Sequence, residues 1–360
     1  MTSGVARLAA LGQSAWYDNL TRPLARGGLD ALVREHAITG VTSNPTIFEK
    51  AIAAGADYAD QLAALGDVGA AEAYWALVVD DIAAAADRLR SVYDATAGAD
   101  GYVSVEVSPL LARETDATVA QARDLFERIG RPNVMIKIPA TVEGLPAIAA
   151  TIAAGINVNV TLIFGLERYA KVIDAYLDGV SRVADPSRVA SVASFFVSRV
   201  DTETDRRLGD GHPLAGRTAV ANAKLAYELF EQRFAAPAWS ALAARGARVQ
   251  RPLWASTSTK NPTYSPTLYV DELIGPNSVN TLAPASIDAL VRHAGLHADT
   301  VRRGVDDARS ALAALANAGV DFDDVTDTLE REGVDSFAQS YRDCLTAIDA
   351  AIADGPPRRR

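Results

Sequence analysis

A single lysine interrupts an otherwise apolar run, Val134-Met135-Ile136-Lys137-Ile138-Pro139-Ala140. The run is short and has turn residues on both sides, which predicts a buried β-strand with the lysine in its middle. Burial disfavours the charged form of an amine, and the neutral form is the one that attacks a carbonyl carbon. Lys137 is therefore a candidate nucleophile for Schiff-base chemistry. The alternative is a lysine at the strand end that extends its ammonium group into solvent.

Lysine is rare in this chain, and its rarity favours a chemical role for Lys137. Only five of the 35 Lys and Arg residues are lysines. Arginine could not act as the nucleophile, because its guanidinium does not release its proton. In a chain that otherwise uses arginine, a lysine inside an apolar strand is less expected to be incidental.

Two carboxylates and several other polar side chains are expected to point towards the same axis as this lysine. Successive side chains of a strand point to opposite faces, and a strand covered by helices needs an apolar outer face. The polar faces must then point inward. They carry Asp18, Glu106, Lys137, Asn159, Thr161 and Ser194. A structural hydrogen-bond network could also fill such an interior, but two carboxylates with one lysine indicate a reactive site.

The elements that must position these residues follow an alternating pattern. The expected strands cover residues 14–20, 40–43, 102–108, 134–140, 157–163, 189–197, 249–255 and 279–282. The expected helices cover residues 29–36, two stretches up to about 97 (the second from 70 to 96), 114–129, 144–154, 166–183, 202–245 and 286–353. Strands that alternate with helices in this way predict an α/β protein with a (β/α)₈ TIM barrel and additional C-terminal helices.

A doubly wound sheet is the alternative to the barrel. It would normally bring a glycine-rich phosphate-binding turn, and the chain has no G-x-G-x-x-G or G-x-x-x-x-G-K motif. No linker or internal repeat divides the chain. We therefore expect a single domain over residues 1–360, in which residues 284–360 form a C-terminal helical extension. In a barrel of this kind the active site lies at the carboxyl ends of the strands.

The composition of the chain limits the kinds of partner that it is expected to bind. The net charge of −10 disfavours general nucleic-acid binding, because phosphate repels an acidic chain. No run is long enough to span a bilayer, and residues 1–11 lack the apolar core of a signal peptide. We therefore expect a cytoplasmic protein that binds neither nucleic acid nor membrane, as a monomer or a homodimer.

No cofactor or metal is expected either. Cys344 is the only cysteine, so an intrachain disulfide and a cysteine cluster are excluded. His293 and His297 have a spacing that can bind zinc on a helix. The glutamate of the H-E-x-x-H motif is missing, however, and no third ligand is evident.

Seven blocks of the sequence match one known family. They are residues 13–19, 40–48, 105–109, 136–141, 157–164, 194–201 and 254–262. The Thr-Ser-Asn-Pro block that contains Asn44, together with the strand of Lys137, is the most specific. On these blocks the chain resembles transaldolases, in particular the longer form found in actinobacteria and cyanobacteria.

The resemblance implies a reaction. A transaldolase transfers a dihydroxyacetone unit through a lysine Schiff base from sedoheptulose 7-phosphate to glyceraldehyde 3-phosphate. The products are erythrose 4-phosphate and fructose 6-phosphate, in the non-oxidative pentose phosphate pathway. The implied partners are sugar phosphates, and the implied mechanism needs no metal or cofactor.

The resemblance also implies roles for individual residues. Lys137 corresponds to the Schiff-base lysine and Asp18 to the general acid and base at the sugar C4 hydroxyl. Glu106 and Thr161 correspond to the pair that holds a water for proton transfer. The residues that would bind substrate are Asn44 and Asn159 at the dihydroxyacetone hydroxyls, Ser194 and Phe196 in the wall, and Arg199, Ser258 and Lys260 at the phosphate. Shorter members of the family have an arginine in place of Lys260.

Two other functions fit the same residues. A Schiff-base aldolase would release free dihydroxyacetone and would move proton transfer to a tyrosine; Asp18 and Glu106 argue against it. A non-catalytic sugar-phosphate-binding barrel would not need a nucleophilic Lys137. The barrel fold alone does not distinguish these functions.

Overall fold

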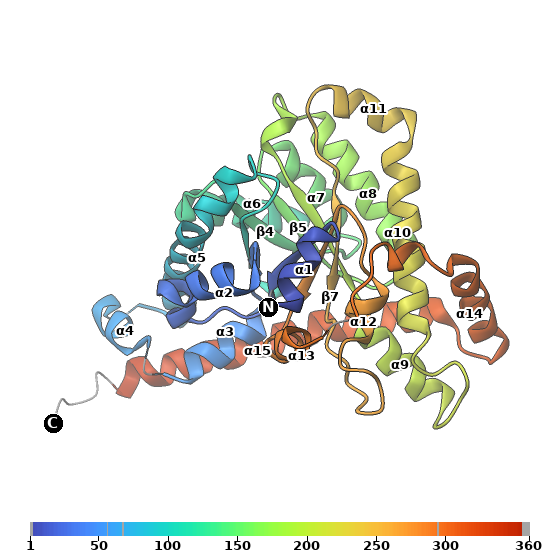
Figure 1. Ribbon diagram of the computed structural model, residues 1–360. Helices are drawn as coiled ribbons and strands as arrows, with labels where there is room; N and C mark the ends of the chain where they lie inside the picture. The colour runs from blue at the N-terminus through green and yellow to red at the C-terminus, as the bar shows by residue number, and fades with distance from the viewer. Residues whose placement is uncertain (1–2, 56, 67, 294, 355–360) are drawn as a thin grey trace.

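Eight parallel strands close into a barrel in their sequence order, β1-β2-β3-β4-β5-β6-β7-β8 (Figure 1). The computed structural model describes residues 3–55, 57–66, 68–293 and 295–354. The strands are β1 Gln13–Tyr17, β2 Gly40–Thr42, β3 Tyr102–Glu106, β4 Val134–Pro139, β5 Val158–Ile163, β6 Ser191–Phe196, β7 Arg251–Ala255 and β8 Ser278–Leu282. The predicted (β/α)₈ barrel is thus confirmed, and all eight predicted strands are present with ends shifted by a few residues.

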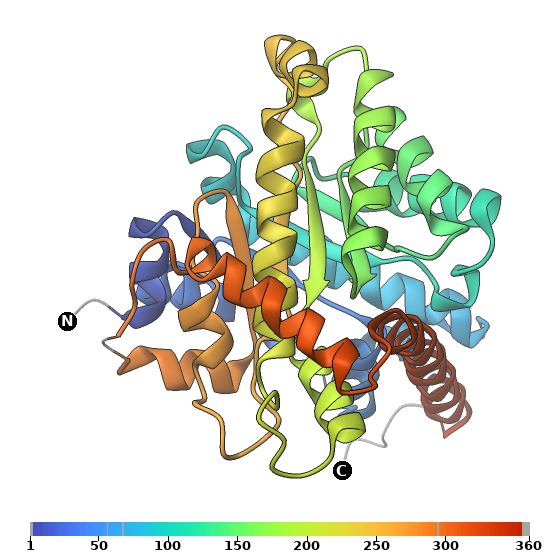
Figure 2. The ribbon, with the colours of Figure 1, turned by 90° about the vertical axis from the view of Figure 1, so that its right-hand side faces the viewer.

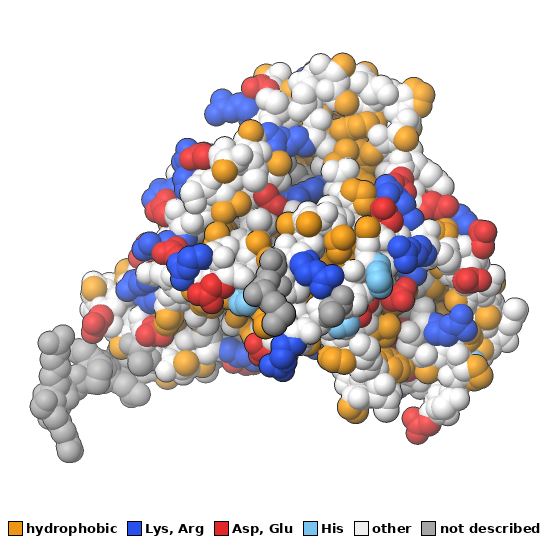
Figure 3. Space-filling model, in the orientation of Figure 1, with side chains coloured by type: hydrophobic (Ala, Val, Ile, Leu, Met, Phe, Trp, Pro, Cys, Tyr) orange, Lys and Arg blue, Asp and Glu red, His pale blue; other side chains and the backbone are white. Residues whose placement is uncertain are grey.

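Helices surround the barrel. They are α1 Gly4–Ala10, α2 Leu29–His36, α3 Pro45–Ala53, α4 Ala59–Leu65, α5 Ala70–Ala95, α6 Thr115–Ile129, α7 Gly144–Ala153, α8 Leu166–Ser181, α9 Ser198–Leu208, α10 Thr218–Ala235, α11 Pro237–Ala244, α12 Leu268–Glu272, α13 Pro284–Val291, α14 Val305–Asn317 and α15 Phe322–Asp354. Within the described residues, no helix combines the length and the apolar character needed to cross a membrane. Basic and acidic side chains are interspersed over the face of the molecule in Figure 3.

Some helical predictions were too coarse. The expected helical region 202–245 consists of three helices, and α9 already begins at Ser198, directly after β6. Gly209, Gly211 and Gly216 have positive φ between α9 and α10, which a helix does not allow. Between β2 and β3, the described residues form three helices, α3, α4 and α5, rather than two.

The spacing of two histidines does not place them on one helix. Helix α13 ends at Val291, before both His293 and His297. His293 Nε2 lies 2.9 Å from Asp271 Oδ1, so this imidazole has a carboxylate partner instead. Among the described residues, no group of three or more His, Cys, Asp or Glu side chains is placed to hold a metal ion.

The C-terminal helix α15 lies across the carboxyl ends of the strands. It is 33 residues long and contacts α3, α5 and α9, as well as the end of β5 (Figures 1 and 2). Gly333 permits the contact with β5, because a Cβ on this residue would lie 2.9 Å from Leu162 Cδ2. Helix α15 therefore packs on the side of the barrel where the active site is expected.

The packing of β1 against β2 requires a glycine at position 40. The register pairs Gly40 with Trp16, and a Cβ on Gly40 would lie 2.4 Å from Cε2 of the Trp16 ring. This ring is fully buried, and its Nε1 donates a hydrogen bond to Asp100 Oδ1 at 2.7 Å, so it has little room to move.

Gly40→Ala should lower the free energy of unfolding by about 1–3 kcal/mol, the usual cost of overpacking. The measurement is denaturant unfolding of both proteins. Gly69→Ala is the matched control, since a Cβ there meets no atom within 4 Å at the start of α5. Equal unfolding midpoints for the two variants would contradict the prediction.

Candidate active site

The buried lysine lies beside a carboxylate at the centre of the site. Lys137 in β4 is 4% exposed, and the register pairs it with Glu106 of β3 and Asn159 of β5. Lys137, Glu106 and Asn159 therefore lie at the same level of the barrel on three adjacent strands, as predicted. Glu106 Oε2 lies 3.4 Å from Lys137 Nζ, and the same amine donates a hydrogen bond to the Ser43 carbonyl oxygen at 3.3 Å. The lysine is thus held in the barrel and does not extend to bulk solvent.

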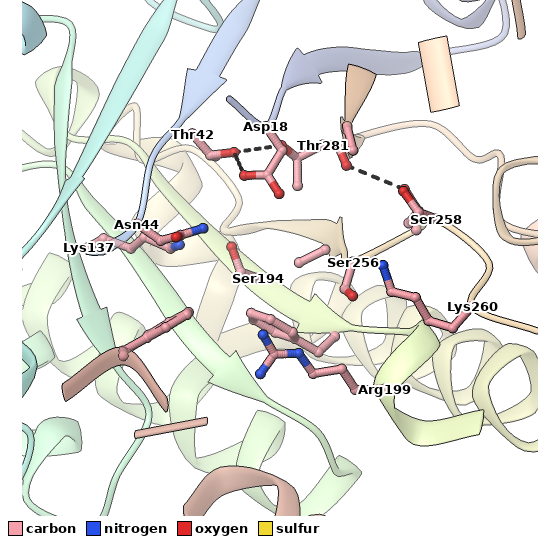
Figure 4. Close-up of a pocket in the computed structure, with 15 residues that line it drawn as sticks. Asp18, Thr42, Asn44, Lys137, Ser194, Arg199, Ser256, Ser258, Lys260 and Thr281 are labelled. Carbon is pink, nitrogen blue, oxygen red and sulfur yellow. Dashed lines mark hydrogen bonds between the residues drawn. The ribbon is translucent and has the colours of Figure 1, made fainter. Parts of the chain in front are cut away.

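A second carboxylate faces the same pocket from the end of β1. Thr42 Oγ1 donates a hydrogen bond to Asp18 Oδ1 at 2.7 Å, and Thr281 Oγ1 lies 2.7 Å from the same Thr42 oxygen (Figure 4). Burial raises the pKa of Asp18 above its usual range, while the Lys137 charge and the Thr42 hydrogen bond act in the opposite direction. A carboxyl group with a raised pKa can exchange a proton closer to neutral pH.

Glu106 in β3 and Thr161 in β5 are buried, and neither of them lines this pocket. Burial also raises the pKa of Glu106, against the charge of Lys137. Thr161 Oγ1 makes no hydrogen bond with any described residue, and Glu106 Oε2 makes none beside its ion pair with Lys137. Buried polar atoms are normally satisfied by protein or by ordered water, so these two have the capacity to bind a small polar molecule.

Strand β5 is irregular next to Thr161. The pairing with β6 shifts between Val160 and Ile163, and Leu162 has a φ of +58°. A left-handed backbone is costly for a residue other than glycine, and such strain gathers at functional sites. The regular alternation predicted for this strand therefore ends at Thr161.

The two predicted amide ligands differ in position. Asn44 lines the pocket, and its Oδ1 accepts a hydrogen bond from the Ile47 backbone as the N-cap of α3. Asn159 lies outside the pocket lining. Its Nδ2 donates to Ser104 Oγ at 3.0 Å and its Oδ1 accepts from Ser194 Oγ at 2.7 Å. Asn159 therefore supports Ser194, which does line the pocket.

The opposite side of the pocket is basic. Arg199 in the first turn of α9 and Lys260 in the loop after β7 lie across the pocket from Lys137 (Figure 4). The Arg199 guanidinium carbon is 5.2 Å from the centre of the Phe196 ring. Ser258 Oγ lies 2.9 Å from Ser286 Oγ, and the Lys260 side chain is exposed at the rim. Two cations and a hydroxyl at one end of a pocket can bind an anionic group.

Seven further residues line the pocket that the sequence reasoning did not select. They are Thr42, Ala255, Ser256, Thr257, Thr281, Ala283 and Phe337. Thr42 could have been found, because it lies two positions before Asn44 at the end of a strand. Phe337 carries no local signal, since it belongs to α15, about 200 residues after Lys137 in the chain.

Fold and site together define a class of protein. A (β/α)₈ barrel that holds a buried lysine, two carboxylates and two cations at the carboxyl ends of its strands has the groups for carbonyl chemistry on an anionic substrate.

Comparison with known proteins narrows this class. The family "Transaldolase/Fructose-6-phosphate aldolase" matches residues 15–348. A transaldolase of Acidothermus cellulolyticus is 53% identical over 98% of both chains. A transaldolase of Frankia alni is 51% identical over 97% of both chains, and one of Thermobifida fusca is 50% identical over 98% of this chain and 99% of its own. The chain belongs to the transaldolase/fructose-6-phosphate aldolase family.

Proposed function

We infer that the protein is a transaldolase. The observation that carries this inference is Lys137, buried beside Glu106, with Asp18 facing the same pocket in a chain about half identical to transaldolases. We propose sedoheptulose 7-phosphate as the donor and glyceraldehyde 3-phosphate as the acceptor of the dihydroxyacetone unit. Erythrose 4-phosphate and fructose 6-phosphate are then the products, and no cofactor or metal takes part.

The first step forms a covalent intermediate. The neutral amine of Lys137 attacks the C2 carbonyl carbon of the donor, and the resulting carbinolamine loses water to give an iminium ion. Glu106 is close enough to Nζ to exchange protons with the reacting groups. A water held between Glu106 and Thr161 would give both side chains a hydrogen-bond partner and carry the proton.

The second step breaks the bond between C3 and C4. The iminium ion accepts the electron pair of this bond while Asp18 takes the proton of the C4 hydroxyl. The aldose phosphate leaves, and an enamine of dihydroxyacetone stays on Lys137. Attack of the enamine on the aldehyde carbon of the acceptor reverses these steps, with Asp18 returning its proton, and hydrolysis of the new iminium ion releases the product.

The pocket favours transfer over simple aldol cleavage. A Schiff-base aldolase that releases free dihydroxyacetone would use a tyrosine for proton transfer. Among the described residues that line the pocket, the aromatic ones are Phe196 and Phe337, and neither carries a hydroxyl. Asp18 is the acid and base within reach.

A coupled assay tests the proposal directly. The protein is incubated with fructose 6-phosphate, and glyceraldehyde 3-phosphate is followed through an NADH-linked reaction with and without erythrose 4-phosphate. Formation of the product only with erythrose 4-phosphate supports the transaldolase. Formation without an acceptor supports the aldolase, and binding without turnover supports the non-catalytic barrel.

Arg199→Met should raise the KM for fructose 6-phosphate by about 10- to 100-fold, since a charge-assisted hydrogen bond to phosphate is lost. Lys260→Met should have a smaller effect, because the exposed lysine acts only as a point charge. Steady-state kinetics of both variants provide the measurement. A larger effect for Lys260→Met would reverse the assignment of the main phosphate ligand.

The remaining roles in the site follow the same proposal. Asn44 and Asn159 bind the hydroxyls of the dihydroxyacetone unit. Ser194, which donates a hydrogen bond to Asn159 Oδ1 and lines the pocket, helps to position this amide. Ser258 assists Lys260 at the phosphate. We further propose that the protein acts in the cytoplasm as a monomer or homodimer, with sugar phosphates rather than nucleic acids or membranes as its partners.

A further inference from the structure

We propose that Phe337 is a positioning residue: it holds the guanidinium of Arg199 where the substrate phosphate binds, so that the C-terminal helix sets the preference for phosphorylated sugars. This inference rests on the proposed function, because it concerns the phosphate end of the same pocket. It also gives the C-terminal helices a role that the sequence did not indicate.

Arg199 is held by aromatic rings rather than by polar partners. Its guanidinium makes no hydrogen bond or ion pair that joins it to another residue of the described part of the chain. The guanidinium carbon lies 5.2 Å from the ring centre of Phe196 and 5.9 Å from that of Phe337. Both distances are within the range of a cation–π interaction. Contacts with rings leave the N–H groups of the guanidinium free to bind a phosphate.

Helix α15 is fixed firmly enough to position Phe337. Gly333 lies four residues earlier, on the same helical face, where a Cβ would be 3.7 Å from Arg199 Nη1. On the other side of Phe337, Ser340 Oγ lies 2.8 Å from Thr46 Oγ1 of α3. One residue further, the Tyr341 ring packs edge-on against Tyr74 with centres 5.0 Å apart. Contacts on both sides therefore set the position of the Phe337 ring.

Preorganisation explains why this contact matters for binding. An arginine side chain has many rotamers, and fixing them on binding lowers affinity. A side chain that is already restrained by two rings loses less freedom when phosphate binds. Removal of one ring should therefore weaken the binding of the phosphate group and leave the carbonyl chemistry at Lys137 in place.

The test compares Phe337→Leu with the wild-type protein in two measurements. The first is the dissociation constant of inorganic phosphate, from isothermal titration. The second is the ratio of kcat/KM for glyceraldehyde 3-phosphate to that for glyceraldehyde as acceptor. We expect the dissociation constant to rise and the ratio to fall by about 3- to 30-fold each, the range of a cation–π contact. Phe337→Tyr keeps the ring and should restore most of both values.

Leu329→Ala is the matched control. Leu329 is also buried on α15 but does not line the pocket, so its truncation loosens the packing of the helix without removing a ring from Arg199. It should lower thermal stability and leave both measurements close to wild type. The proposal would be overturned if Phe337→Leu left the dissociation constant of phosphate and the ratio of kcat/KM values unchanged. It would also be overturned if Leu329→Ala shifted both quantities as much as Phe337→Leu does. A wild-type protein that binds phosphate without transferring dihydroxyacetone would refute the transaldolase function, and the phosphate titration would still decide the role of Phe337.

Discussion

Replacing Lys137 by methionine should lower the rate of dihydroxyacetone transfer by about 10⁴-fold or more, the scale on which an enzyme loses activity with its nucleophile. Methionine has a similar length and no amine, so the iminium ion cannot form. Lys137→Arg should fail equally, since it keeps a charge next to Glu106 but does not attack a carbonyl.

The covalent intermediate provides the decisive measurement. The protein is treated with borohydride in the presence of fructose 6-phosphate and its peptides are analysed by mass spectrometry. The wild-type protein should carry a reduced dihydroxyacetone adduct on Lys137, and erythrose 4-phosphate should remove the unit before reduction. Lys171→Met is the control, because Lys171 is an exposed residue paired with Glu167 outside the pocket. A folded, active protein with no adduct at Lys137 would exclude the Schiff-base mechanism.

Replacing Asp18 by asparagine should separate the two steps of the reaction. Asparagine keeps an oxygen that can accept the hydrogen bond from Thr42 but cannot take the proton of the C4 hydroxyl. We expect kcat to fall by about 10²- to 10⁴-fold, the usual contribution of a general base. The iminium ion with fructose 6-phosphate should still form and be trapped on Lys137, with the six-carbon sugar intact.

The pH dependence provides a second test of Asp18. Cleavage requires the ionised carboxylate, so kcat should rise with pH as Asp18 loses its proton. Because burial raises the pKa of this group, the rise should occur above the usual carboxyl range. This rise of kcat with pH should be absent in Asp18→Asn. A variant that retains full activity, or one that no longer forms the adduct, would assign the proton transfer to another group.

Much of the barrel follows from local patterns in the sequence. The alternation of short apolar runs with helical ones predicted all eight strands, because each pattern repeats within a few residues. The polar positions within those runs predicted which side chains point inward, and the register of Glu106 and Lys137 confirms this for β3 and β4. The left-handed backbone of Leu162 and the shifted pairing of β5 with β6 were not predicted, since the alternation of side chains carries no signal for either.

The chemical groups of the site were also evident in the sequence. A lysine in an apolar strand is unusual enough to be noticed alone. Asp18 directly follows β1, and Glu106 stands at a polar position of β3. The roles of these residues came from the resemblance to a family, because residue type does not specify which substrate atom a carboxylate will meet.

Sequence by itself thus determined the fold class and indicated the candidate reactive residues, since both depend on which residue types occur at which short spacings. Tertiary structure decided which side chains meet. The contact between Thr42 and Thr281 next to Asp18 depends on the closure of β1, β2 and β8 into one barrel. The contact between Phe337 and Arg199 depends on where α15 crosses the strand ends. Contacts of this kind join residues more than 100 positions apart. They are set by packing against several elements at once, and no local pattern in the chain records them.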